Sequence, residues 1–194
     1  MLMHKGTQII NTDRLLLRRF EFDDAYDMFK NWVNDSVVTK FLTWKPHNNV
    51  DVTKEILEQW INEYENNNIY NWAIELKEIG EVIGGISIVK LDENYYSCEI
   101  GYCMSKGYWG KGIMSESLKA VIDYLFSEVG FNRIAAKHDT NNIASGKVMA
   151  KSGMKYEGTL RQVKFHDNKE FYDLDLYAIL KDDWIRNNDF KRGE

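Results

Sequence analysis

The segment at residues 104–117, MSKGYWGKGIMSES, places three glycines between an apolar, strand-like run and a helix-like run. Glycine permits a positive φ and lets a ligand or another backbone approach closely. A helix that begins here presents unpaired N–H groups and the positive end of its dipole. The segment therefore predicts a seat for a phosphate or pyrophosphate group, and the alternative interpretation is a tight turn from a strand into a helix.

Periodicity before this loop predicts two helices and four strands. Apolar residues recur at helical spacing in two segments, and they alternate or cluster in the others. We expect helices at 23–33 and 52–65, a loop at 34–50, and strands at 13–20, 70–77, 81–90 and 95–104. Gly80 separates two of these strands, which indicates a hairpin.

Periodicity after the loop predicts a long helix, a strand, a short helix and a final hairpin. We expect them at 113–129, 131–138, 142–153 and 158–180, with Gly153 ending the short helix and HDNK turning the hairpin. The fold class is therefore α/β. The strand–helix–strand unit at 96–138 implies one parallel pair of strands in a sheet that is otherwise antiparallel.

Length and charge limit the classes of protein that fit. A chain of 194 residues suits a single domain, here 1–194, and its net charge of −5 argues against nucleic acid as a partner. No apolar run approaches the ~18 residues of a membrane span. The first residues lack the apolar core of a signal peptide. We therefore expect a cytoplasmic protein with no membrane partner.

The residues that could hold a metal or a disulfide are few and badly spaced. Cys98 and Cys103 lie on one predicted strand at an odd separation, so their side chains should point to opposite faces. His47, His138 and His166 show no ligand spacing. We expect neither a disulfide nor a metal site.

Two nucleotide-binding alternatives use similar glycine loops. A dinucleotide fold also has a strand, a glycine loop, a helix and a second strand, and Asp139 stands where its ribose-binding acid would stand. The glycine order here is G-x-x-G-x-G rather than G-x-G-x-x-G, and no further βαβ unit follows. A P-loop is excluded because no Ser or Thr follows Lys111.

Four segments together resemble the GNAT superfamily of N-acetyltransferases. EIGYCMSKGYWGKGIMSESLKAVIDYLF is similar to its acetyl-CoA-binding segment, and NIASGKVMAKSGM is similar to its next motif. TDRLLLRRF and DLDLYAILKDDW resemble the branch that contains the ribosomal-protein-alanine N-acetyltransferases. The resemblance covers about 11–186. It implies a single domain with a central, mostly antiparallel seven-stranded sheet flanked by about four helices.

This chain departs from the family pattern at three places. Gly107 stands where members carry Gln or Arg, which leaves the pyrophosphate to backbone amides and Lys111. Met149 stands where many members carry a Tyr that acts as general acid. Met154 replaces a Phe.

The resemblance implies a role for the glycine loop and for the strand before it. Gly110 and Gly112, with the N–H groups of the residues from Trp109 through Lys111 to Ile113, would cradle the pyrophosphate of acetyl-CoA. Cys103 and Met104 would offer backbone groups to its pantetheine arm, where this strand and the next separate. Asn142 would bind the cofactor or cap its helix.

Two side chains are candidates for catalysis. Glu99, on the strand that enters the loop, would remove the proton of the amine, commonly through water. Ser145, one turn before Met149, would donate a hydrogen bond to the leaving thiolate. The alternative interpretations are a salt-bridged Glu and a small residue chosen for close packing.

Aromatic residues gather in the first helices and the loop after them, namely Trp32, Phe41, Trp44, Trp60 and Tyr64. The resemblance places them at the acceptor cleft, whereas their helical spacing is typical of core residues. Trp44, which lies in the predicted loop, is the best candidate to border the acceptor.

The resemblance implies an acetyl-CoA-dependent N-acetyltransferase, a monomer or homodimer, that moves the acetyl group directly to a primary amine. The acceptor we expect is the N-terminal α-amine of a peptide or protein. Alternatives are a small amine such as a polyamine, an antibiotic or an amino acid, a dinucleotide-dependent oxidoreductase, and a non-catalytic acyl-CoA-binding module.

Overall fold

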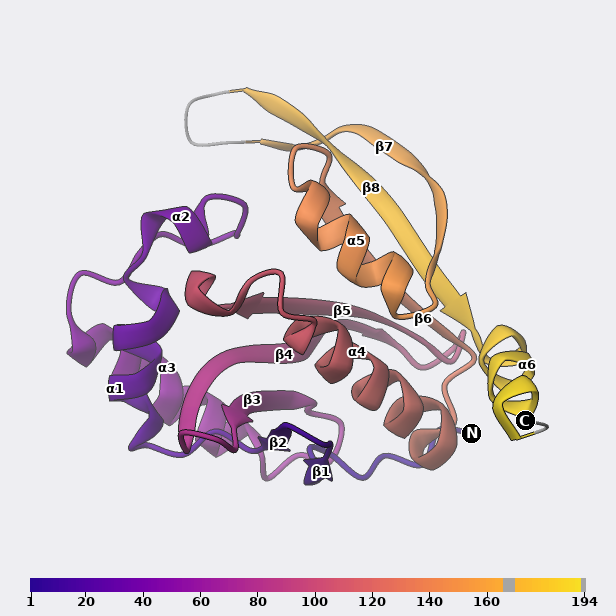
Figure 1. The fold of residues 1–194 in the computed structure, drawn as a ribbon, viewed down its shortest axis with the longest axis horizontal. Helices are drawn as coiled ribbons and strands as arrows, with labels where there is room; N and C mark the ends of the chain where they lie inside the picture. Colours follow the sequence, from indigo (N-terminus) through magenta and orange to yellow (C-terminus); the bar gives the residue numbers. More distant parts are fainter. Residues whose placement is uncertain (166–169, 193–194) are drawn as a thin grey trace.

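A single mixed sheet organises the molecule (Figure 1), a computed structural model that describes residues 1–165 and 170–192. Its strands lie in the order β1-β2-β3-β4-β5-β6-β8-β7. They are β1 Ile10–Asn11, β2 Leu15–Arg18, β3 Asn71–Leu76, β4 Glu81–Asp92, β5 Ser97–Met104, β6 Arg133–Asp139, β7 Lys155–Phe165 and β8 Phe171–Leu180. The helices are α1 Asp24–Met28, α2 Ser36–Thr39, α3 Val50–Glu63, α4 Ile113–Tyr124, α5 Ile143–Lys151 and α6 Lys181–Arg192.

One pair of neighbouring strands, β5 and β6, is parallel, and the other neighbours within the described sheet are antiparallel. The crossover between β5 and β6 contains the glycine loop and α4. This arrangement confirms the parallel pair expected for 96–138, because two parallel strands need a connection of this length.

The parallel pair is short, and this positions the functional site. β5 pairs with β6 only from Ser97↔Arg133 to Ile100↔Ala136. Beyond these residues the strands separate, and Figure 1 shows β6 and β8 diverging from β5 toward the side on which α2 lies. The last residues of β5, 101–104, remain paired with β4 alone.

Helices cover both faces of the sheet. In β3, Trp72 and Ile74 belong to the core cluster that contains the buried stripe of α4, whereas Ala73 between them belongs to the cluster under α1 and α3. Side chains alternate between faces along a strand, so these clusters lie on opposite sides of the sheet. The apolar stripe of α4 is therefore buried on one face, and those of α1 and α3 on the other.

The glycines at two element ends adopt the conformations that the sequence predicts. Gly80 has a φ of +66° in the turn between β3 and β4, and Gly153 has a φ of +89° after α5. The final hairpin forms as β7 and β8, while its predicted turn at HDNK lies outside the described residues. Glycine occupies such positions because a Cβ destabilises a left-handed backbone.

The fold has one strand and two helices more than the sequence predicts. The described part of the chain has eight strands, because the two-residue β1 pairs with β2, and a segment this short carries no periodicity. It has six α-helices rather than about four. The side chain of Asp35 accepts a hydrogen bond from Val37 N and caps α2 within the predicted loop. α6 was not expected, since its sequence is largely polar.

Two predicted helices are also less regular than their periodicity suggests. The helix expected at 23–33 ends in a π-helical turn at Phe29–Val33. The helix expected at 113–129 forms as α4 and ends in a second π-helical turn at Leu125–Val129.

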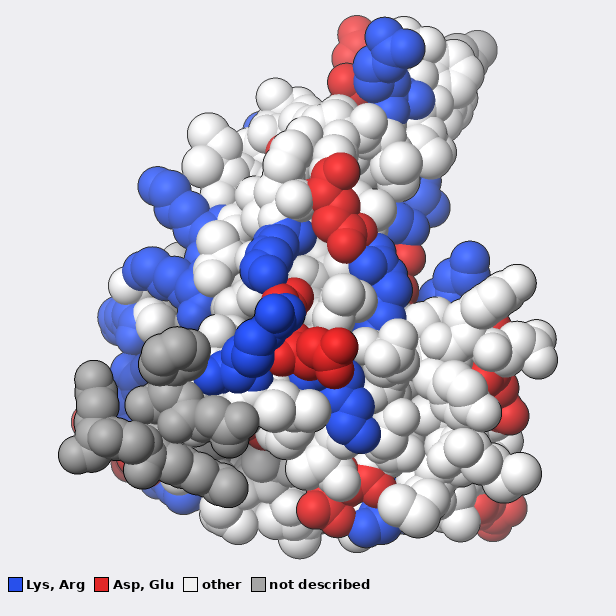
Figure 2. All heavy atoms as spheres, turned by 90° about the vertical axis from the view of Figure 1, so that its right-hand side faces the viewer, with Lys and Arg blue, Asp and Glu red and all other residues white. Residues whose placement is uncertain are grey.

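Basic and acidic side chains are interspersed on the face that Figure 2 shows. Ion pairs on the helix–strand junction near α6 have the same mixed character, including Lys155 with Asp183 at 2.7 Å.

Candidate active site

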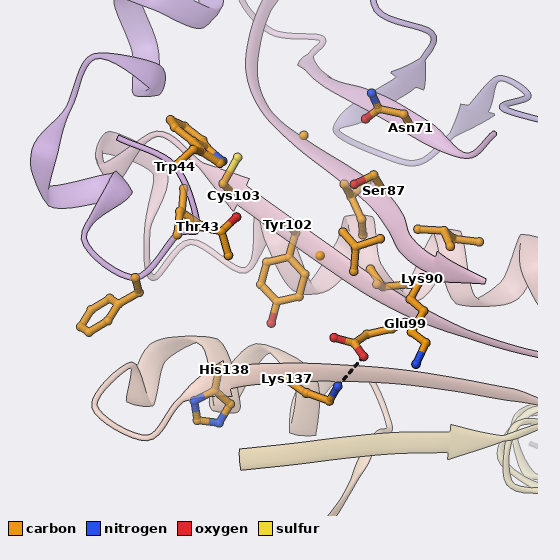
Figure 3. Close-up of a pocket in the computed structure, with 18 of the residues that line it drawn as sticks. Thr43, Trp44, Asn71, Ser87, Lys90, Glu99, Tyr102, Cys103, Lys137 and His138 are labelled. Atoms are coloured by element: carbon orange, nitrogen blue, oxygen red, sulfur yellow. Dashed lines mark hydrogen bonds and ion pairs between the residues drawn. The ribbon is translucent and has the colours of Figure 1, made fainter. Parts of the chain in front are cut away.

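A cleft of about 1000 Å³ opens where β5 and β6 separate. Its walls include β4, β5, the start of α5 and the segment around α2. Figure 3 shows Trp44 and Cys103 at one end, an ion pair between Glu99 and Lys137 at the other, and Tyr102 between them. Clefts of this size that combine apolar walls with a few polar groups are typical ligand sites.

The glycine loop lies at the end of β5 and starts α4 as the sequence predicts. Gly110 and Gly112 have φ values of +77° and +78°, and Gly112 is the residue before the first turn of α4. No side chain caps this turn. A Cβ on Gly110 would meet nothing within 4 Å. Open space beside uncapped N–H groups at a helix start fits a pyrophosphate.

Arg14 anchors this loop from the turn before β2, a role that no sequence pattern predicted. Its Nη1 donates to the carbonyl of Lys111 at 3.0 Å, and its guanidinium pairs with Glu116 of α4 at 2.6 Å. The C=O of Lys111 and the N–H of Gly112 belong to one planar peptide and point in opposite directions. Arg14 therefore directs that N–H away from itself.

Substitution of Gly112 should weaken acetyl-CoA binding about tenfold. A non-glycine residue in the left-handed conformation costs about 1–2 kcal/mol, and about 1.4 kcal/mol is a factor of ten in affinity. A Cβ here would lie 3.7 Å from Arg14 Nη2, which is an ordinary van der Waals contact, so the expected loss comes from the strained backbone of Gly112→Val. Calorimetric titration with acetyl-CoA would measure the loss.

Gly107 supplies the matched control for this prediction. It lies in the same loop, its φ is not in the left-handed region, and a Cβ would approach only Ser105 Oγ, at 3.8 Å. Gly107→Val should leave the affinity nearly unchanged. Equal losses in both variants would show that any side chain in the loop perturbs binding, and that backbone conformation is not the cause.

Other predicted cofactor residues lie around the end of β5 and the start of α4. The indole N–H of Trp109 donates to the carbonyl of Met104 at 2.9 Å, which ties the loop to the end of β5. Cys103 borders the cleft, and Ile113 is buried at the start of α4. Burial raises the pKa of the Cys103 thiol to about 12, so this side chain stays a thiol at neutral pH.

Asn142 caps α5, as one of its two predicted roles requires. Its Oδ1 accepts a hydrogen bond from Ser145 N at 3.3 Å, and the residue also lines the cleft. Lys111, in contrast, is exposed, and its ammonium lies 5.1 Å from the ring centroid of Tyr108.

Glu99 lies on the cleft wall in an ion pair. Its Oε2 accepts from Lys137 Nζ at 2.6 Å, and this pair lies at the end of the paired region, since Glu99 is still in register with Ala135 and Lys137 follows the last residue of β6 that pairs with β5. Among the described residues no other hydrogen-bond donor contacts the carboxylate. Oε1 is therefore available to an amine or a water molecule.

Tyr102 is the site residue that sequence reasoning missed. Its Oη lies 3.0 Å from Ser145 Oγ and 3.1 Å from the carbonyl oxygen of Ser145. Burial raises the pKa of the phenol, so Tyr102 remains protonated. Met149, at the family's tyrosine position, is a core residue with 1% exposure. No sequence signal pairs Tyr102 with Ser145, because the contact depends on α5 crossing β5.

The aromatic residues divide between core and cleft. Trp32 and Tyr64 are buried in the core under α1 and α3, as their spacing predicts. Phe41, Trp44 and Trp60 are only half-buried and line the cleft. The ring of Trp44 lies 5.4 Å from that of His47, which Thr53 holds by a hydrogen bond of 2.8 Å.

The remaining candidates find structural explanations. Cys98 packs in the α4 cluster and Cys103 against the opposite one, so the two free thiols do point to opposite faces. Oδ1 of Asp139 accepts from the backbone and side-chain N–H groups of Asn141, which makes it part of a local turn. No group of three or more His, Cys, Asp or Glu within the described ranges could hold a metal ion.

No helix in the described part of the chain is both long enough and apolar enough to cross a membrane.

Comparisons with known proteins agree on one family. A model of the acetyltransferase (GNAT) domain matches residues 14–155. The uncharacterized N-acetyltransferase YoaA of Bacillus subtilis is 32% identical over 173 residues, 89% of this chain and 97% of that protein. The ribosomal-protein-serine acetyltransferase of Escherichia coli is 32% identical over 102 residues, 53% and 56% of the two chains.

Solved structures give the same fold. An acetyltransferase of the GNAT family from Bacillus anthracis superposes with a TM-score of 0.79 at 29% identity, over 90% of this chain and 99% of that one. A ribosomal L7/L12 α-N-protein acetyltransferase in complex with coenzyme A superposes at 0.79, with 21% identity over 89% and 98%.

The family model covers most of the chain, and YoaA matches it almost from end to end. The chain therefore belongs to the GNAT family of N-acetyltransferases and is an acyltransferase enzyme with a single-domain α/β GNAT fold.

Proposed function

We propose that this enzyme transfers the acetyl group of acetyl-CoA directly to a primary amine, and that its preferred acceptor is the α-amine at the N-terminus of a peptide or protein. The observation that carries the proposal is the separation of β5 from β6, which leaves a cleft along β5, the strand that leads into the glycine loop and the start of α4. Relatives whose names specify ribosomal-protein acetylation support the choice of acceptor.

The glycine loop would bind the pyrophosphate of acetyl-CoA. The N–H groups at the start of α4 provide donors and a positive dipole end, and Arg14 holds the loop in place. Cys103 of β5 lines the opening in which the pantetheine arm would lie, and Met104 follows it at the end of the strand. Binding there would place the thioester between Glu99 and Ser145, which both line the cleft.

The transfer then needs one base and one hydrogen-bond donor. The amine nitrogen forms a bond to the thioester carbon, and the carbon–sulfur bond breaks. Glu99 accepts the proton that the amine loses, directly or through water, and Ser145 donates to the departing sulfur. Fixing both reactants in one cleft itself lowers the barrier by several kcal/mol.

The chemistry of the acceptor favours an α-amine over a lysine side chain. An α-amine has a pKa of about 7.7–8.0 and a lysine about 10.4, so far more of the former is neutral at pH 7. A neutral amine can attack at once, so the base has one proton to take from it and not two. The half-buried rings of Trp44 and Trp60 would border the residue that carries this amine.

A competition experiment tests the acceptor. The enzyme and acetyl-CoA would be mixed with a short peptide with a free N-terminus, its N-blocked lysine-containing twin, spermidine and an aminoglycoside, and the products identified by mass spectrometry. We expect the free peptide to be acetylated at its N-terminus ahead of the others. Preference for spermidine or the aminoglycoside would refute the peptide acceptor and leave acetyl transfer intact.

A further inference from the structure

The contact between Tyr102 and Ser145 crosses the opening between β5 and α5. Both residues line the cleft, and the two oxygens of Ser145 near the phenol, Oγ and the carbonyl oxygen, lie 3.0 and 3.1 Å from Tyr102 Oη. Figure 3 shows the Tyr102 side chain reaching from β5 across this gap, away from Trp44 and Cys103. A strand tyrosine thus holds the helix residue that faces the cleft.

Tyr102 leaves β5 on the face opposite to Glu99. The two residues are an odd number of positions apart in one strand, so their side chains alternate to different faces. Glu99 forms an ion pair with Lys137. Tyr102 instead contacts Ser145 of α5 and packs against the core cluster under α4. The base and the hydroxyl pair therefore flank the opening from its two sides.

Contacts other than the one with Tyr102 hold the backbone of Ser145 in place. Asn142 Oδ1 accepts from Ser145 N, and Gly146 of the next position packs against His138, whose Nε2 would lie 2.6 Å from a Cβ there. The backbone of Ser145 therefore has little freedom. What remains free is the rotation of its hydroxyl, and within the described residues Tyr102 is the side chain that hydrogen-bonds to Oγ.

We propose that Tyr102 is a positioning residue for acetyl transfer. Its single phenolic proton has two acceptors within reach, the carbonyl oxygen of Ser145 at 3.1 Å and Oγ at 3.0 Å, and Tyr102 acts when the thioester is bound by donating this proton to Oγ. That bond occupies a lone pair of Oγ and leaves the proton of Ser145 for the departing sulfur. No proton leaves Tyr102 in this step, since the phenol only orients the serine. The inference rests on the proposed role of Ser145 as the donor to sulfur.

This arrangement explains how the enzyme manages without a tyrosine at position 149. A tyrosine on the helix could donate to sulfur itself, but Met149 is buried in the core and has no proton to donate. A serine hydroxyl is small and rotates freely, so its proton has no fixed direction. A buried phenol in contact with it supplies that direction and stays protonated.

A double-mutant cycle on initial rates tests the proposal. Ser145→Ala should lower kcat about 100-fold and Tyr102→Phe about tenfold, each with little change in the KM for acetyl-CoA. If Tyr102 acts through Ser145, the double variant should be no slower than Ser145→Ala alone. Thioester donors whose leaving thiols have lower pKa values should recover part of the rate in both single variants.

Tyr124→Phe is the matched control. Its hydroxyl donates to the carbonyl of Gly6 at 2.8 Å, on the same side of the sheet but outside the cleft. This variant removes a comparable hydroxyl and should keep the wild-type kcat. A similar loss of kcat in Tyr124→Phe and Tyr102→Phe would assign the effect to stability.

The other possible outcomes test the role of Tyr102 and the role of Ser145 separately. An unchanged kcat in Tyr102→Phe would overturn the positioning role, and so would an equal tenfold loss when Ser145 is already Ala. An unchanged kcat in Ser145→Ala would instead remove Ser145 as the donor, and acetyl transfer by the other variants would still support the proposed function.

Discussion

Glu99→Gln should lower the rate of acetyl transfer at neutral pH by about 10²–10⁴-fold, the contribution typical of a positioned general base. Glutamine keeps the shape of the side chain but cannot accept the proton. As the pH rises through the pKa of the α-amine, about 7.7–8.0, the acceptor loses its proton to solvent, so the deficit should shrink. Initial rates from pH 6 to 10 with a peptide acceptor would measure this.

The control for Glu99→Gln must account for Lys137. The substitution leaves the Lys137 ammonium without its carboxylate partner, and this alone can disturb the cleft. The double variant Glu99→Gln with Lys137→Met removes both charges and should show the same shrinking deficit. A deficit that stays constant with pH in both variants would exclude Glu99 as the base.

Phe126→Ala should lower the free energy of unfolding by about 3–5 kcal/mol, the cost of removing a buried aromatic ring. Phe126 is completely buried in the cluster under α4, and its ring lies 5.6 Å from that of Trp184 in α6. Domains of this kind are stable by only about 5–15 kcal/mol, so the loss is large. Urea denaturation followed by circular dichroism would report it.

Phe22→Ala is the control for this loss. Phe22 is 50% exposed, and its removal should change the free energy of unfolding by less than about 1 kcal/mol. If both variants unfold at the same urea concentration, Phe126 is not part of the cooperative core, and the π-helical turn at Leu125–Val129 opens separately from the sheet.

Features that depend on neighbours in the sequence were predictable. The helix start after Gly112, the cap at Asn142 and the turn at Gly80 each follow from the conformational limits of one or two residues. The periodicity of α4 likewise identified the helix that buries its stripe against the sheet. The parallel pair followed from the order of the elements.

Contacts between distant segments were not predictable, because they depend on how the elements cross. Arg14 and Glu116 pair across 102 positions, and Tyr102 meets Ser145 across 43. Gly84 is another example, since its Cβ would lie 2.6 Å from the carbonyl oxygen of Cys103 on the adjoining strand. Glycine there reflects a close approach of two strands, for which the sequence of either strand alone holds no signal.

The β5–β6 junction also has a mechanical consequence. Four register pairs join a five-stranded wing, β1–β5, to a three-stranded wing, β6–β8, and the glycine loop with α4 bridges the same two wings. A junction this short should let the angle between the two wings change more easily than the longer pairing of β6 with β8 would. A ligand bound between the wings would contact both of them. Its binding free energy would therefore stabilise the contact between β5 and β6 against local opening. Amide hydrogens of β6 near Lys137 should then exchange more slowly when acetyl-CoA is present, while those of β3 keep their rates.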